Sequence, residues 1–164
     1  MWRRGEAVVD TDPARLDQEM MHAFLTESYW ARGRSRDELA VAVTNSLPFG
    51  LYLEGPGARS EGGERQVGFA RVVTDRLTFA YVADVFVLPA ERGRGLGSFL
   101  MGCVLDCPDT RSVRYWTLFT RDAHALYRRF GFGPLQGERL ARFMIRHGPA
   151  GDLPAAGGAP ERPS

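Results

Sequence analysis

The 164-residue sequence has little excess charge, few cysteines and no long apolar run. Its 21 basic and 20 acidic residues give a net charge of +1, which excludes a bulk attraction to nucleic acid or to an anionic membrane. It has no run of about 18 apolar residues, and its first residues lack the apolar stretch of a signal peptide. The two cysteines, Cys103 and Cys107, lie too close in sequence for a useful disulfide. We therefore expect a cytoplasmic protein without a nucleic-acid or membrane partner.

The length and the hydrophobic fraction of 44% suit one domain with an ordinary core. Residues 148–164 are rich in Gly, Pro and Ala without periodicity, which predicts a disordered tail after a domain over residues 1–147. Residues 55–65 are rich in glycine and charge and predict a mobile loop.

Hydrophobic periodicity and capping residues predict the order of helices and strands. Helices are predicted over residues 12–28, 35–44, 96–107 and 122–130, and strands over 6–10, 49–54, 66–74, 77–88 and 113–120, with Phe132 and residues 139–147 as a last pair. Antiparallel strands followed by a strand–helix–strand crossover predict an α/β fold. Its sheet should be mixed and mostly antiparallel, with about six or seven strands and helices on both faces.

The most informative stretch, residues 85–100, has the pattern of an apolar strand, a glycine-rich turn and an amphipathic helix. The start of a helix presents unpaired N–H groups and a positive dipole end. Glycine lets the backbone approach a ligand closely, and arginine adds charge near phosphates. These features predict an anion cradle suited to a pyrophosphate. The turn consists of Arg92, Gly93, Arg94, Gly95, Leu96, Gly97 and Ser98.

The residues of this turn do not match the signature of a dinucleotide-binding fold or of a nucleotide P-loop well. The near match to the dinucleotide signature G-x-G-x-x-G has Ser98 at the third glycine, and no carboxylate occurs in residues 113–119, where that signature needs one. No Gly-Lys-Ser or Gly-Lys-Thr follows, as a P-loop would require. A turn that merely joins a strand to a helix is the structural alternative.

Two motifs together resemble those of the Gcn5-related N-acetyltransferase (GNAT) family. Residues 92–97 fit the cofactor motif of this family, and residues 123–132 fit its Ala-x-x-Leu-Tyr run ending in Gly-Phe. The resemblance implies acetyl-CoA as the donor and direct transfer of the acetyl group, within a ternary complex, to a primary amine of a small molecule or peptide. One departure is Thr120, which stands where many members have an Asn that contacts the cofactor.

The resemblance also implies where acetyl-CoA binds. The pyrophosphate would rest on the amides of residues 92–98, and the pantetheine arm would enter where the preceding strand splays from the next parallel strand. The residues implied on the arm are Phe86, Val87, Thr120 and Ala123.

Amine acetylation needs a neutral amine, a hydrogen-bond donor for the developing oxyanion and a proton for the departing thiolate. The resemblance places the Tyr127 hydroxyl near the thioester sulfur as the acid, although Tyr127 shares an apolar helix face with Leu126 and could be a core residue. A backbone N–H near Val87 is expected to polarise the carbonyl.

Asp84 is the only carboxylate inside strand 77–88, where a buried acid needs a partner or a function. It is predicted to orient the ammonium or to accept its proton through water. A structural bond to the backbone or to an arginine is the alternative. Strand alternation turns Asp84 away from Tyr81 and Val87, so a bulge between Asp84 and Val87 would be needed to bring it round.

The acceptor side is less defined. In this family the connection between the first two helices, here residues 28–34, often walls the acceptor site, so Tyr29 and Trp30 are predicted to contact the amine unless they serve helix packing. Tyr81 is predicted to face the acceptor from its strand. Carboxylates are scattered, so no polycation pocket is expected and no metal ligands are assigned.

Two further functions stay open. The chain could be a non-catalytic acyl-CoA-binding sensor or interaction module on the same fold, or, with less support, a nucleotide-binding enzyme. Members of the family are often dimers, which leaves a homodimer open.

Overall fold

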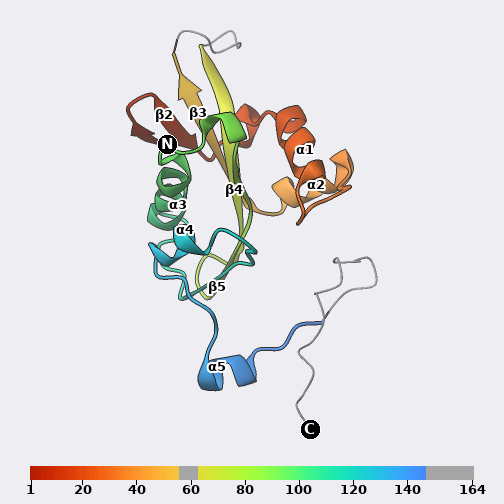
Figure 1. Cartoon of the computed structure of the whole chain (residues 1–164), viewed down its shortest axis with the longest axis vertical. Helices are drawn as coiled ribbons and strands as arrows, with labels where there is room; N and C mark the ends of the chain where they lie inside the picture. Colours follow the sequence, from red (N-terminus) through yellow and green to blue (C-terminus); the bar gives the residue numbers. More distant parts are fainter. Residues whose placement is uncertain (56–62, 147–164) are drawn as a thin grey trace. The chain divides into compact units, whose positions relative to one another are not determined.

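The computed structural model describes residues 1–55 and 63–146, and within them the chain forms a six-stranded sheet. The strands lie in the order β1-β2-β3-β4-β5-β6 (Figure 1), and every neighbouring pair is antiparallel except the parallel pair β5 and β6. The mixed, mostly antiparallel sheet predicted from the sequence is thereby confirmed. The strands are β1 (Trp2–Arg4), β2 (Ala7–Asp10), β3 (Leu47–Glu54), β4 (Glu64–Thr74), β5 (Phe79–Val87) and β6 (Tyr115–Thr117).

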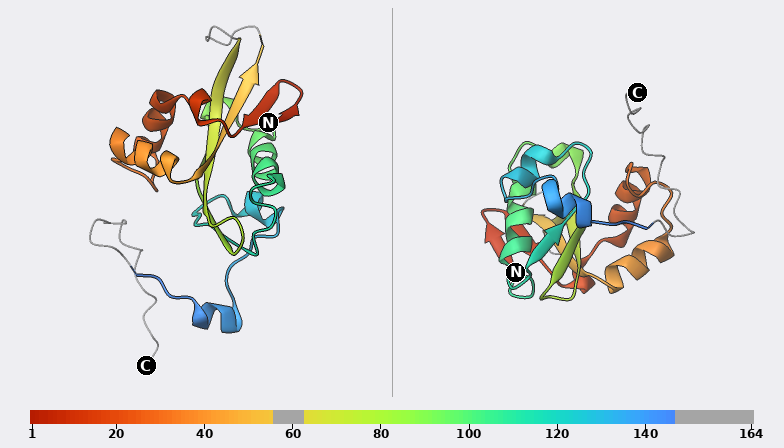
Figure 2. Two further views of the ribbon diagram at one scale, coloured as in Figure 1. Left: turned by 180° about the vertical axis from the view of Figure 1, so that it is seen from behind. Right: turned by 90° about the horizontal axis from the view of Figure 1, so that it is seen from below.

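Helices cover both faces of the sheet, as predicted (Figures 1 and 2). On one face, α1 (Gln18–Glu27) and α2 (Arg36–Thr44) bury Met21 and Leu39 in a cluster with Phe69 and Phe86 of the sheet. On the other face, α3 (Leu96–Asp106) and α4 (His124–Arg128) join the larger core. Each layer thus buries apolar side chains, which is the main favourable contribution to folding.

The sheet splays at β5. The parallel pairing joins only Phe79–Tyr81 to Tyr115–Thr117, while β5 continues to Val87 without β6 beside it. This divergence also explains why the strand predicted over residues 113–120 is shorter in the structure. Beyond Thr117 the chain has left β5, its only neighbour in the sheet, and therefore has no backbone partner with which to extend the ladder.

A bulge interrupts β5 at Asp84. Phe69 pairs with Phe86 and Arg71 with Ala83, so β5 has one more residue than β4 in this interval. Asp84 has a φ of 52°, an uncommon value for a non-glycine residue. The bulge predicted in this part of the strand is therefore present, and it lies at Asp84.

Local capping explains where the first helices begin. Ser35 and Glu38 form the expected capping box at the start of α2. The helix predicted over residues 12–28 is divided, because Asp12 caps only the short 3-10 turn Pro13–Arg15 and Asp17 then caps α1. The Asp17 N–H donates to the Gln66 side chain on β4 at 2.7 Å, and this tertiary bond holds the break in place.

The strand predicted over residues 6–10 is present as β2, but it forms a hairpin with β1, which the sequence analysis missed. Residues 2–4 pair with 7–9 around Gly5, whose φ of 58° suits a tight turn. The helix predicted over residues 122–130 is also shorter, and Gly131 ends this region with a φ of 81°, as a C-terminal glycine does.

Residues 134–146 belong to a separate unit from residues 1–133, and the last strand predicted over residues 139–147 is wrong as far as it is described. The chain forms the helix α5 (Gly137–Arg142) instead, with a Glu138–Arg142 ion pair four residues apart. Glu, Arg, Leu and Ala favour helix, and they outweigh the short apolar alternation that follows. His147, the predicted tail and most of the predicted loop at 55–65 lie outside the described residues. In the two described ranges, no helix is long and apolar enough to cross a membrane.

Candidate active site

The turn after β5 has the geometry of an anion cradle. After the 3-10 turn Pro89–Glu91, Gly93 and Gly95 adopt φ values of 81° and 71°, and Gly95 caps α3 in the left-handed conformation. No side chain of the described residues caps this helix start, so the N–H groups of its first turn have no side-chain partner there. The backbone therefore offers N–H donors of the kind that an anion binds, and the positive φ angles are what require glycine here.

The arginines of the turn hold its shape. The Arg92 Nε donates to the Val87 carbonyl at 3.0 Å, which ties the turn to the end of β5. Arg94 pairs with Glu6 and with the buried Glu91, which also pairs with Arg65. The hydrogen bond from Arg65 is the main cause that lowers the pKa of Glu91, so this carboxyl is ionised at neutral pH.

Arg4 of β1 is a cradle residue that sequence reasoning missed. Its guanidinium lies 4.7 Å from the centre of the Phe99 ring, and its Nη2 lies 3.5 Å from the Arg94 carbonyl. A Cβ on Gly95 would be 3.7 Å from Arg4 Nη1. The hairpin thus adds a cation beside the helix start, and no local pattern in the sequence predicts this contact.

The splay leaves one backbone edge of β5 without a strand. Leu88 N–H donates to Val67 on β4, so strand alternation turns the N–H and carbonyl of Val87 to the opposite, open edge. The carbonyl accepts from Arg92, which leaves the Val87 N–H at that edge. The Phe86 carbonyl faces Gly68 of β4, and the Phe86 ring stacks on Phe24, with centroids 4.1 Å apart. Alternation therefore gives the edge to Val87, not to Phe86.

Tyr127 is buried beside this edge. A Cβ on Gly97 of α3 would lie 3.9 Å from Val87 and 3.7 Å from Leu126, so α3, β5 and α4 meet here. The Tyr127 ring packs edge-on against Phe132 with centroids 6.0 Å apart. Burial, with smaller contributions from Tyr29 and Asp122, raises the pKa of Tyr127 to about 12. Its phenol therefore keeps its proton through the neutral range.

The loop before α4 is fixed by Thr120, whose hydroxyl accepts from the Ala123 N–H at 3.0 Å. The hydroxyl hydrogen stays available for a second bond. Ala123 itself is half-buried at the N-terminus of α4. Both residues thus sit where the second sequence motif enters the helix.

The Asp84 side chain at the bulge is bound by two arginines. Its Oδ2 accepts from Arg34 Nη1 and from Arg71 Nε, each at 2.6 Å. The arginine partner that the sequence analysis named as an alternative is therefore present twice. Oδ1 accepts no bond from the described residues. Tyr81 lies close by, and its burial, followed by the charge of Asp84, raises its pKa.

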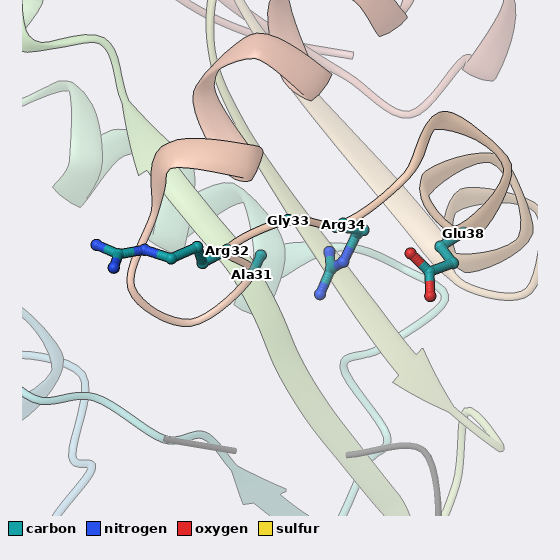
Figure 3. A pocket seen from close by; sticks show the side chains of 5 residues that line it. All are labelled: Ala31, Arg32, Gly33, Arg34 and Glu38. Carbon is teal, nitrogen blue, oxygen red and sulfur yellow. The ribbon is translucent and has the colours of Figure 1, made fainter. Parts of the chain in front are cut away.

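The connection between α1 and α2 reaches the loop after β6. The Tyr29 hydroxyl accepts from the Arg121 N–H at 3.0 Å, and the Arg121 guanidinium lies 3.8 Å from the centre of the Tyr29 ring. Trp30 packs on Tyr29 and Phe24, in agreement with the helix-packing alternative. The same connection contains a shallow hollow of about 260 Å³. It is lined by Ala31, Arg32, Gly33, Arg34 and Glu38 (Figure 3).

A splayed sheet with an anion cradle at the end of one strand, and a buried phenol beside it, is the architecture of an enzyme class that binds a phosphorylated acyl donor. Comparison with known proteins identifies the family. The family profile described as "Acetyltransferase (GNAT) domain" matches residues 58–134. The solved structure of a GNAT-family protein from Xanthomonas campestris pv. campestris is 40% identical, with a TM-score of 0.75, and the match covers 87% of this chain and 94% of that one. The chain belongs to the GNAT acetyltransferase family.

Other relatives agree with this assignment. A Gibberella zeae protein, named only as a candidate acetyltransferase, is 36% identical over 111 residues, which cover 61% of this chain and 63% of that protein. The soybean (Glycine max) histone acetyltransferase TAP1 is 30% identical over 132 residues, which cover 77% and 56%. The chain thus spans only 63% and 56% of these two curated relatives. Mycobacterium tuberculosis Rv2747, solved in complex with CoA, shares the fold at 19% identity with a TM-score of 0.59, over 79% of this chain and 74% of that one.

Proposed function

We propose that this chain is an acetyl-CoA-dependent N-acetyltransferase that acetylates a primary amine of a small molecule or peptide by direct transfer. One observation carries the proposal. β5 parts from β6 after Tyr81 and leads into a helix start without a side-chain cap among the described residues, while Tyr127 is buried where α4 meets the end of β5. The end of β5 therefore brings together the anion cradle, the open strand edge and the phenol. The CoA in the Rv2747 structure supports the assignment of the donor.

Different groups bind the different parts of acetyl-CoA. The N–H groups of Leu96, Gly97 and Ser98 hold the diphosphate at the dipole end of α3, and Arg4 adds a positive charge. The Val87 N–H donates to the arm or to the carbonyl that enters the open edge. Acetyl-CoA supplies an acetyl group already activated as a thioester.

Proton handling falls to two side chains. The Tyr127 hydroxyl gives its proton to the sulfur that leaves, and its raised pKa keeps that proton in place beforehand. Asp84 Oδ1, which the two arginines leave free, orients the amine or takes its proton through water. The amine nitrogen bonds to the acetyl carbon as the carbon–sulfur bond breaks.

Calorimetric titration with acetyl-CoA, followed by thiol release with a panel of amines, tests this function. The chain contains no lysine, so no side-chain amine of its own competes as an acceptor. We expect binding of acetyl-CoA and amine-dependent release of thiol. Binding without release from any amine would instead support the non-catalytic acyl-CoA module, and absence of binding would overturn the assignment of the cradle.

A further inference from the structure

The cluster of Arg34, Asp84 and Arg71 contains two cations and one anion. All three side chains are largely removed from solvent, with exposures of 21% for Arg34, 12% for Arg71 and 2% for Asp84. The surplus charge therefore lies in a partly desolvated place, where it attracts an anion more strongly than on an open surface. Because the cluster sits at the bulge of β5, this surplus is built into the candidate active site.

Among the described residues, most hydrogen-bond donors of these arginines have no partner. A guanidinium carries five N–H donors, and each of these two makes one bond among the described residues, to Asp84 Oδ2. The remaining nitrogens are not sealed off, because in residues 1–55 and 63–146 the only fully buried side-chain polar atom without a partner is the Tyr52 hydroxyl. The nitrogens that do not bond to Asp84 thus keep some contact with solvent, and the planar guanidinium geometry matches a carboxylate.

The surroundings contain more cations than anions. Arg32 and Arg34 line the hollow in Figure 3, and Arg121 stacks on Tyr29 at the facing loop. Glu38 is the carboxylate that lines the hollow. Its Oε2 accepts from the Ser35 N–H and hydroxyl, and its charge, which interacts with that of Arg34, offsets one of these positive charges. An acceptor with several ammonium groups would be repelled here, whereas one with its own anion would be attracted.

We propose that the acceptor is an amine that carries its own carboxylate, an amino acid or a compound of that kind. Its carboxylate binds the free donors of Arg34 and Arg71, and its amine lies toward Asp84 Oδ1. This proposal rests on the acetyltransferase function above. The amine nitrogen forms a bond to the acetyl carbon, the carbon–sulfur bond breaks, one proton leaves the nitrogen and one reaches the sulfur. The products are an N-acetyl amino acid and CoA with a free thiol.

Matched acceptors that differ only in the carboxylate test the proposal. Lysine is compared with cadaverine, ornithine with putrescine, and each amino acid with its methyl ester, at saturating acetyl-CoA with thiol release as the readout. We expect kcat/KM at least about tenfold higher for each carboxylate, the factor that a charge-assisted hydrogen bond supports. The amine of the ester is less basic and has the larger neutral fraction, so intrinsic reactivity favours the ester and works against the expected result.

Variants link the preference to the cluster. Arg34→Gln should bring the carboxylate-to-ester ratio toward one, mainly through a higher KM for the amino acid, and Arg34→Lys should restore part of it. Arg36→Gln is the matched control, because Arg36 is exposed, pairs with Glu19 and should leave the ratio unchanged. Acetyl-CoA binding and the melting temperature are measured for each variant, which separates lost recognition from lost folding.

Three outcomes would overturn the proposal. If esters or diamines react as well as the carboxylates, or if a lysine-rich peptide is the best acceptor, the assignment of the acceptor fails while the acetyltransferase function stands. If Arg34→Gln folds, binds acetyl-CoA and keeps the full carboxylate-to-ester ratio, the cluster is not the recognition site. If no amine releases thiol although acetyl-CoA binds, both proposals fail together.

Discussion

Replacement of Tyr127 by phenylalanine removes one oxygen from the centre of the candidate active site. The ring contact with Phe132 does not involve the hydroxyl, and this hydroxyl has no hydrogen bond to any residue in the described ranges. The variant therefore loses no bond on folding, and we expect its free energy of unfolding to stay within about 1 kcal/mol of wild type. A fall in activity can then be read as a loss of chemistry.

The kinetic effect follows from the role of a general acid. Such a group contributes about 10²- to 10⁴-fold, so kcat should fall at least about 100-fold, or about 2.7 kcal/mol of barrier. With its pKa raised to about 12, the phenol stays protonated across the whole range of the assay. The ratio of the wild-type kcat to the variant kcat should therefore be constant from about pH 6 to 10. No alkaline decline of kcat in that range should come from Tyr127.

The assay is thiol release at saturating acetyl-CoA and amine, with the dissociation constant of acetyl-CoA measured separately by calorimetry. Tyr115→Phe is the matched control, because Tyr115 is 60% exposed on β6 and has no assigned role. A Tyr127→Phe protein that binds acetyl-CoA and keeps more than about a third of kcat would refute the reasoning. Tyr127 would then be a core residue only.

Three further changes test other contacts. Tyr52→Phe should raise the free energy of unfolding by about 1 kcal/mol in chemical denaturation, because the buried Tyr52 hydroxyl has no partner in the described residues; a loss of stability would show that it has one. Arg4→Gln should weaken acetyl-CoA binding about 3- to 10-fold in calorimetry at low salt, whereas Arg3→Gln, which loses only a pair with Glu54, should not; equal effects would exclude a specific role for Arg4. Glu91→Gln should cost about 1–2 kcal/mol of stability at neutral pH, after a discount for its half-exposed arginine partners. The pKa of Glu91 is lowered on folding, so this difference should vanish as the pH falls through that lowered pKa; a difference that persists in acid would show that charge is not its cause.

The cofactor side of the site could be predicted from the sequence because its geometry is local. Gly93 and Gly95 determine the backbone of their own turn, and the apolar spacing from Leu96 onward defines the helix that follows. The capping box at Ser35 is local in the same way. In each case the residues that carry the signal are also the residues that form the structure.

Predictions failed where a distant contact decides the local structure. The break before α1 depends on a bond from Asp17 to Gln66, 49 residues away, and the length of β6 depends on where β5 diverges. Arg4 reaches the cradle across 90 residues of sequence. Periodicity within a window of about 11–18 residues has no access to such partners.

The acceptor side is encoded almost wholly in contacts of this second kind. Arg34 reaches Asp84 over 50 residues, and Tyr29 reaches Arg121 over 92. The sequence does show that Asp84 is a buried acid and therefore needs a partner, but 21 arginines are available to supply it. The choice of two of them changes the chemistry of the site, because one arginine would neutralise Asp84 and a second leaves a net positive charge. The identity of the second cation, and with it the basis of the proposed preference for an anionic acceptor, becomes visible only when the fold brings Arg34 and Arg71 to the same oxygen.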